Sequence, residues 1–157
     1  MSDRAERILV VDDVPENVRL LEAVLEGAGY EVVSTTDGLV ALELAVDAKP
    51  DLVLLDVRMP PPDGLAVCRQ LRKRQETAAL PVIMLTASEG SEKATAIHAG
   101  ADDFIPKPFN RDELLTRIRS LIRIKRYQDT IEAQAAELVD LNRTLAEREA
   151  RRNPVDS

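Results

Sequence analysis

Short apolar runs alternate with stretches of helical periodicity along most of the sequence. The first run, residues 7–11, is rich in β-branched residues and ends at two aspartates, which predicts a strand buried on both faces. From Val14 to Ala28 the apolar positions recur at alternating intervals of four and three, with Pro15 near the start and glycines near the end. That pattern predicts a helix of about three to four turns.

The same unit of strand and helix then repeats. Further strands are predicted at residues 31–34, 52–55, 81–85 and 103–105, and helices through residues 39–46, 65–71 and about 92–99 and from Arg111 onward. Three prolines predict an irregular loop at residues 58–64. Five strands alternating with five helices imply right-handed parallel crossovers. The predicted fold class is therefore α/β, a doubly wound five-stranded parallel sheet in a three-layer sandwich.

Charged and hydroxyl side chains follow four of the predicted strands, at the point where each strand ends. Asp12 and Asp13 follow the first strand, Asp56 the third, Thr86 the fourth and Lys107 the fifth. Each has an ordinary explanation alone: an aspartate caps a helix, a threonine ends a strand, and a lysine is a solvated charge. Together they would meet in the crevice outside the carboxyl ends of a parallel sheet, where three carboxylates repel one another unless a cation is present. Mg²⁺ takes oxygen ligands and fits such a cluster without His or Cys.

The ends of the strands carry five short motifs. They are ILVVDD at residues 8–13, LLDVRMP at 54–60 with DG at 63–64, LTA at 85–87, GADDF at 100–104 and KPF at 107–109. In this order, the motifs resemble those of the two-component response-regulator receiver domain, a CheY-like family, over about residues 5–123. The resemblance implies a flavodoxin-like sheet with strand order 2-1-3-4-5. It also implies a switch that takes a phosphoryl group from a histidine kinase.

The resemblance assigns metal-binding and acceptor roles to four residues. Asp56 corresponds to the phosphoacceptor, a carboxylate nucleophile that forms an aspartyl phosphate. Asp13 and Asp56 correspond to the direct carboxylate ligands of Mg²⁺, and Asp12 to a ligand that binds it through water. The backbone carbonyl of Arg58 completes the protein's share. The expected cofactor is therefore Mg²⁺.

The resemblance also implies how the phosphoryl group is stabilised and how its presence is sensed. Lys107 would supply a second positive charge, and its peptide bond to Pro108 is cis in the family. Thr86 would donate a hydrogen bond to a phosphoryl oxygen and move toward Asp56. Phe104 matches an aromatic switch position that turns inward as the threonine moves, and the alternative is an ordinary core phenylalanine. We do not expect an enzyme beyond self-directed phosphoryl transfer and hydrolysis.

Composition narrows the compartment and the partners. The 157 residues are 45% hydrophobic and 31% charged, with no apolar run long enough for a bilayer and no signal-peptide pattern. The single cysteine, Cys68, cannot form an internal disulfide, which fits a reducing compartment. We therefore expect a cytoplasmic protein. The net charge of −7 disfavours direct binding to nucleic acid or to an anionic membrane, since both attract basic surfaces.

Residues 123–151 contain no proline or glycine and are rich in helix-forming residues. Apolar residues spaced by seven form one row, and a second row lies three residues further on: Ile124, Ile131, Leu138 and Leu145, then Tyr127 and Leu141. Gln134 and Arg148 weaken the second row. The pattern predicts a parallel two-stranded coiled coil and hence a homodimer, and the alternative is an amphipathic helix that folds back on its own domain. The predicted organisation is a receiver domain at 5–123, a helical coiled-coil linker or dimerisation segment at 124–151 and a disordered tail at 152–157.

Two interpretations of the whole protein stay open. The residues after Arg123 are too few for a DNA-binding or enzymatic output module. The chain is therefore a stand-alone regulator, or the receiver and linker of a longer protein with an output domain.

A haloacid-dehalogenase-like phosphatase also uses an Asp nucleophile and Mg²⁺, but its second Asp lies two residues on, whereas Asp12 and Asp13 are adjacent. A phosphorylation-independent scaffold is disfavoured because no expected site residue is missing.

Overall fold

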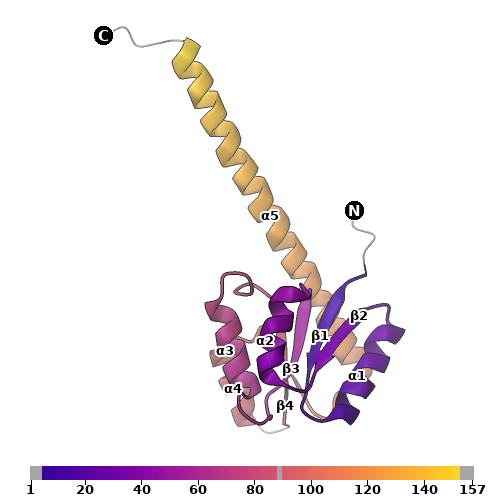
Figure 1. Cartoon of the computed structure of the whole chain (residues 1–157). Helices are drawn as coiled ribbons and strands as arrows, with labels where there is room; N and C mark the ends of the chain where they lie inside the picture. The colour runs from indigo at the N-terminus through magenta and orange to yellow at the C-terminus, as the bar shows by residue number, and fades with distance from the viewer. Residues whose placement is uncertain (1–4, 88–89, 153–157) are drawn as a thin grey trace. The chain divides into compact units, whose positions relative to one another are not determined.

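The computed structural model describes residues 5–87 and 90–152, which include a five-stranded parallel sheet with helices on both faces (Figure 1). The strands are β1 (Arg7–Val11), β2 (Glu31–Thr35), β3 (Leu52–Asp56), β4 (Val82–Thr86) and β5 (Asp103–Pro106), in the order β2-β1-β3-β4-β5. The predicted fold class and strand order are confirmed. The predicted strand bounds differ from the observed ones by at most one residue at either end.

Within the described ranges, a helix follows each strand in turn: α1 (Pro15–Gly27), α2 (Gly38–Asp47), α3 (Gly64–Lys73), α4 (Gly90–His98) and α5 (Arg111–Arg152). Asp37 and Asp63 cap α2 and α3, since each side chain accepts a hydrogen bond from an amide of the first turn. Helix α4 begins at Gly90 rather than at about Glu92 as predicted. The difference arises because its first two residues, Gly and Ser, add nothing to the apolar periodicity.

The sheet separates two apolar layers, because alternate residues of a strand point to opposite faces. In β1, Leu9 and Val11 pack with residues of α2, α3 and α4, whereas Ile8 and Val10 pack with residues of α1 and of the first part of α5. The central strands β1, β3 and β4 are almost entirely buried, as their continuous apolar runs predict. This packed sheet fixes the positions of the strand ends.

One arginine connects three segments at the edge of the sheet opposite the strands' carboxyl ends. Arg72, in α3, donates hydrogen bonds to the carbonyl oxygen of Leu80 at 2.7 Å and to that of Gly100 at 2.8 Å. It also forms an ion pair with Asp102 at 2.9 Å, and Asp102 accepts the amide of Val82 at 2.8 Å. The end of α3, the start of β4 and the turn after α4 are therefore held by a single side chain.

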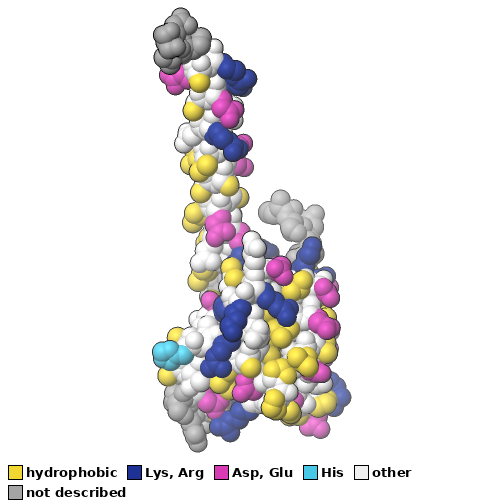
Figure 2. Space-filling model, turned by 60° about the vertical axis from the view of Figure 1, so that its left-hand side comes forward, with side chains coloured by type: hydrophobic (Ala, Val, Ile, Leu, Met, Phe, Trp, Pro, Cys, Tyr) yellow, Lys and Arg dark blue, Asp and Glu magenta, His cyan; other side chains and the backbone are white. Residues whose placement is uncertain are grey.

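Helix α5 begins inside the compact part of the chain, which ends at Ile122. The buried residues of α5 all lie in that part, whereas residues 123–152 belong to a separate unit with exposed apolar side chains. Hydrophobic side chains recur along this second segment (Figure 2). The predicted disordered tail starts at Arg152, the last helical residue, and residues 153–157 lie outside the described residues. No helix in the described ranges combines the length and the low polarity that a bilayer span requires.

Candidate functional site

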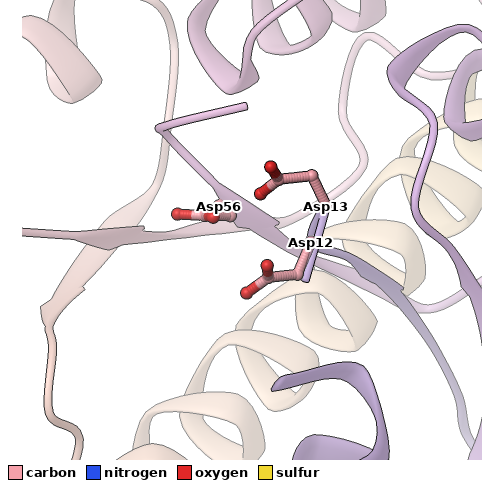
Figure 3. Close-up of side chains that lie close together, drawn as sticks. All are labelled: Asp12, Asp13 and Asp56. Atoms are coloured by element: carbon pink, nitrogen blue, oxygen red, sulfur yellow. The ribbon is translucent and has the colours of Figure 1, made fainter. Parts of the chain in front are cut away.

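Three aspartates meet at the carboxyl ends of β1 and β3. Asp12 and Asp13 directly follow β1, and Asp56 is the last residue of β3, the neighbouring strand. One carboxylate oxygen from each residue lies within 4.8 Å of the others, and the three carboxylates point to the same side (Figure 3). Asp12 and Asp56 are buried, and Asp13 is half-buried. The structure brings together the three carboxylates that the sequence singles out.

The ammonium group of Lys107 lies against two of these carboxylates. Its Nζ is 3.0 Å from Asp56 Oδ1 and 3.4 Å from Asp12 Oδ2. The Lys107 amide donates to the carbonyl oxygen of Thr86 at 2.7 Å, which anchors the base of the side chain beside β4. The Lys107–Pro108 peptide bond is cis, as the resemblance implies. Since the cluster holds three carboxylates and the Lys107 ammonium group contacts two of them, these groups together carry an excess of negative charge that favours a bound cation.

Asp56 ionises less readily than an exposed aspartate. Burial raises the pKa of its carboxyl group above the ordinary value of 3.8, and the hydrogen bond and charge of Lys107 lower that pKa in part. The negative charge of Asp12 raises it further. A cation at the cluster would oppose both burial and repulsion, and would hold Asp56 in the carboxylate form that a nucleophile requires.

The hydroxyl group of Thr86 is a buried donor that finds no acceptor among the described residues. Thr86 ends β4 and is fully buried, and the residue before it pairs with Asp56 across the sheet. Its Oγ1 has no hydrogen-bond partner among the described residues. Buried polar groups are almost always hydrogen-bonded, and leaving one unsatisfied costs roughly 1–3 kcal/mol. The Thr86 hydroxyl therefore suits a ligand that brings an oxygen acceptor to this end of the sheet.

Two loops at the site are joined by Glu92, which the sequence analysis did not single out. Its side chain, in the first turn of α4, accepts a hydrogen bond from the Ala87 amide at 3.2 Å and forms an ion pair with the Arg58 guanidinium at 2.8 Å. Arg58, the predicted carbonyl ligand, also donates its own amide to Asp56 Oδ1 at 3.4 Å. Neither periodicity nor a short motif marks Glu92, because its contacts join loops that are distant in sequence.

An open cavity of about 500 Å³ lies among these groups. It is lined by the following residues: Asp13, Val14, Asn17, Asp56, Arg58, Ala87 and Lys107. The predicted switch residue Phe104 is not among them. It lies half-buried in β5, with Lys93 Nζ 5.2 Å from the centre of its ring. The structure thus gathers the predicted metal and acceptor residues at one place and puts Phe104 on the neighbouring edge strand.

A second cavity, of about 550 Å³, lies between α1 and the start of α5. Its walls are mainly apolar and include Leu20, Val24 and Phe109. Asp12 and Lys107 line the cavity too, so that a group placed in it would lie next to the acidic site. Leu20 lies outside the row of apolar positions of the predicted amphipathic helix and is exposed, and this could have pointed to the apolar cavity.

Comparisons with known proteins agree with this geometry. A family model described as the response regulator receiver domain matches residues 8–119. The DNA-binding dual master transcriptional regulator RpaA of Synechocystis is 44% identical over 118 residues, which are 74% of this chain and 49% of RpaA. The response regulator MprA of Mycobacterium tuberculosis is 43% identical over 147 residues, which are 93% of this chain and 63% of MprA. The chain thus spans less than two thirds of the length of either relative.

A solved structure also matches in fold. The receiver domain of a sensor histidine kinase from Pseudomonas aeruginosa, solved with a magnesium ion coordinated in its active site cleft, has a TM-score of 0.71 and 33% sequence identity. The match covers 76% of this chain and 98% of that domain.

Proposed function

Because the chain belongs to the response regulator receiver domain family, we propose that it is a signalling switch that takes a phosphoryl group from a histidine kinase onto Asp56. The observation that carries this proposal is the setting of Asp56. Its carboxylate is buried at the end of β3, 3.0 Å from the Lys107 ammonium group, and Thr86, whose hydroxyl has no partner among the described residues, ends the neighbouring strand β4. A nucleophile, a cation and a hydroxyl donor therefore lie at the carboxyl ends of β3, β5 and β4, on one edge of the sheet.

The acidic cluster fits Mg²⁺. Its donors are oxygen atoms, from Asp12, Asp13, Asp56 and the backbone carbonyl of Arg58, and Mg²⁺ prefers such ligands. Both oxygens of Asp12 already have partners, Oδ1 the amide of Val14 at 3.0 Å and Oδ2 the Lys107 ammonium group. This favours Asp13 and Asp56 as direct ligands and Asp12 as a ligand through water. When bound, Mg²⁺ supplies positive charge to the cluster and to a transferring phosphoryl group.

In the proposed reaction, a carboxylate oxygen of Asp56 attacks the phosphorus of a phosphohistidine. The P–N bond breaks, its electron pair leaves with the imidazole, and a P–O bond forms to give an aspartyl phosphate. Lys107 stabilises the charge on the phosphoryl oxygens, and the Thr86 hydroxyl donates to one of them. Hydrolysis of this acyl phosphate resets the switch, so the chain acts on itself rather than as an enzyme on other substrates.

The proposed output begins at Thr86. A phosphoryl group adds a charge of about −1.5 to −2, which draws the Thr86 hydroxyl toward Asp56 and alters the space beside β5. Phe104, half-buried on that strand, then turns inward. Replacing Phe104 with Ala should leave phosphorylation of Asp56 intact and remove its effect on the partner or the dimer. Loss of phosphorylation itself in this variant would count against a switch role.

The apolar cavity between α1 and the start of α5 supports the proposal that a kinase docks on this chain. Leu20 and Phe109 line it and offer a surface for apolar side chains of a helical partner. Since Asp12 and Lys107 line the same cavity, a phosphohistidine presented beside it would be within reach of Asp56. This arrangement suits a donor protein that docks while it transfers the phosphoryl group.

The second unit is proposed to be a parallel coiled coil that forms a homodimer and connects the switch to an output domain or partner. Its heptad row is exposed along the described helix: Ile124 50%, Ile131 64%, Leu138 59% and Leu145 50%. Burying both copies of one leucine in a dimer stabilises it by about 3 kcal/mol, so Leu138→Glu should raise the dimer dissociation constant at least roughly a hundredfold. Val139→Glu, one position off the row and 69% exposed, is the matched control. Sedimentation equilibrium measures both, and equal effects would exclude the heptad interface.

The phosphoacceptor role is tested by intact mass after incubation with acetyl phosphate, with and without Mg²⁺. We expect one phosphoryl adduct that needs Mg²⁺ and is absent in Asp56→Asn. Asp47→Asn, an exposed carboxylate at the end of α2, is the control and should be modified like the wild type. An adduct that persists in Asp56→Asn, or no adduct in any of the proteins, would refute the assignment.

A further inference from the structure

We propose that Glu92 is a positioning residue that holds the site in its resting arrangement and competes with a phosphoryl group for the Ala87 amide. The inference rests on the proposed phosphoacceptor role of Asp56. Ala87 directly follows Thr86 and lines the 500 Å³ cavity together with Asp56 and Lys107. Its amide is therefore a donor at the place where a phosphoryl group would lie.

Both oxygens of the Glu92 carboxylate are engaged at the edge of this cavity. Oε1 accepts the Ala87 amide at 3.2 Å, and Oε2 lies 3.0 Å from Nε and 2.8 Å from Nη2 of Arg58. The Glu92 side chain is only 14% exposed, whereas that of Arg58 is 69% exposed. A mostly buried anion of the chain itself thus connects the loop after β3 to the loop after β4.

A phosphoryl group on Asp56 would disturb this arrangement in two ways. It brings three strong acceptor oxygens, which need donors such as the Thr86 hydroxyl, the Lys107 ammonium group and the Ala87 amide. Its charge also repels the Glu92 carboxylate at short range. The phosphoryl group and Glu92 therefore exclude one another at the Ala87 amide, and phosphorylation releases the first turn of α4 from the site.

An ordinary helix cap would have a different geometry. A glutamate in the first turn stabilises the helix through its dipole, and in a capping box it reaches back to the amide of its own N-cap residue. Glu92 instead reaches Ala87, three positions before Gly90, the first helical residue. A cap alone would change the stability of α4 and leave the affinity of the site for a phosphoryl group unchanged.

Beryllofluoride, a phosphoryl analogue, separates these roles when it is titrated with Mg²⁺ present and the Ala87 amide is followed by ¹H–¹⁵N NMR. The proteins compared are the wild type, Glu92→Gln and the control Glu132→Gln, which changes an exposed carboxylate of the second unit. Without the analogue, the Ala87 resonance should shift in Glu92→Gln alone. Because the acceptor of the Ala87 amide loses its charge, which weakens that hydrogen bond and removes the repulsion of the analogue, Glu92→Gln should bind the analogue about three- to tenfold more tightly. At saturation, its Ala87 resonance should coincide with that of the wild type.

The outcomes are distinct. A shifted Ala87 resonance with unchanged or weaker binding would make Glu92 a structural cap and overturn the inference. Circular dichroism establishes that each variant is folded. Absence of binding in all three proteins would refute the phosphoacceptor role of Asp56 itself, and with it the role of Glu92.

Discussion

Adding one methyl group at Gly64 should displace the end of β3 that carries Asp56. Gly64 is the first residue of α3, and its amide donates to the carbonyl oxygen of Val57 at 3.1 Å, so its backbone lies directly against this strand end. A Cβ at Gly64 would overlap the carbonyl oxygen of Asp56 and lie 2.9 Å from the Asp56 carbonyl carbon and from Cα of Val57. Carbon atoms in contact prefer about 3.5–4.0 Å, so the backbone must move by roughly 0.6 Å or more.

The expected loss of stability follows from the fact that the atoms nearest to the added Cβ belong to the backbone. Overpacking of this kind costs about 1–3 kcal/mol, which for a domain of this size lowers the melting temperature by roughly 4–12 °C. A displaced acceptor should also slow phosphorylation by acetyl phosphate, by up to about a hundredfold for a shift near 1 Å. Gly27→Ala is the matched control: a Cβ there meets nothing within 4 Å, and alanine at the end of α1 should stabilise the chain by about 0.4–1 kcal/mol.

Thermal unfolding followed by circular dichroism and the initial rate of adduct formation measured by intact mass give the two readouts. Gly64→Ala should have a lower melting temperature and a slower initial rate of adduct formation than the wild type, and Gly27→Ala should show neither decrease. Wild-type stability and rate in Gly64→Ala would refute the close approach of α3 to Asp56. Equal destabilisation by both substitutions would attribute the effect to glycine replacement in general.

Three further perturbations test the Asp56 carboxyl group, the core and the Arg72 contacts of the compact unit. Burial raises the pKa of the Asp56 carboxyl group, so the folded chain binds the carboxyl proton more tightly than the unfolded chain does. The stability that this proton adds is fully present below the unfolded pKa, near 3.8, and is lost as pH rises through the folded pKa. Asp56→Asn should therefore be more stable than the wild type in metal-free buffer at neutral pH, and unfolding curves with the same pH dependence in both proteins would contradict this. Burial also raises the pKa of the Cys68 thiol, so iodoacetamide should alkylate it rapidly only in denaturant, and fast reaction of the native chain would contradict its position in the core. Arg72→Ala should lower the unfolding free energy by about 1.5–3 kcal/mol in urea denaturation, since it removes the arginine donor from the part-buried carbonyl groups of Gly100 and Leu80, and a loss below about 0.5 kcal/mol would match an ordinary surface substitution instead.

The fold and the acidic cluster could be predicted because both follow from periodicity and topology. Buried β-branched runs mark the strands, and parallel strands bring their carboxyl ends to one edge, so Asp12 and Asp56 had to lie close. The contacts of Arg72 and Glu92 could not be predicted in this way. Each depends on how far a long side chain reaches between loops, and such contacts leave no periodic trace in the sequence. That the Thr86 hydroxyl lacks an acceptor within the described part of the chain is likewise a property of packing alone.

Among the residues that the structure describes, the two ends of α4 are held with unequal strength. After its last turn, the carbonyl oxygen of Gly100 accepts a hydrogen bond from Nε of Arg72, and Ala99 is packed in the core. At its first turn, Glu92 is held by one amide and by the exposed guanidinium of Arg58, a kind of pair worth about 0–1 kcal/mol. A helix that is held firmly at one end and weakly at the other can rotate about the firmly held end. Release of Glu92 would therefore swing the start of α4 far more than its end, and a partner that senses the first turn would receive the largest displacement.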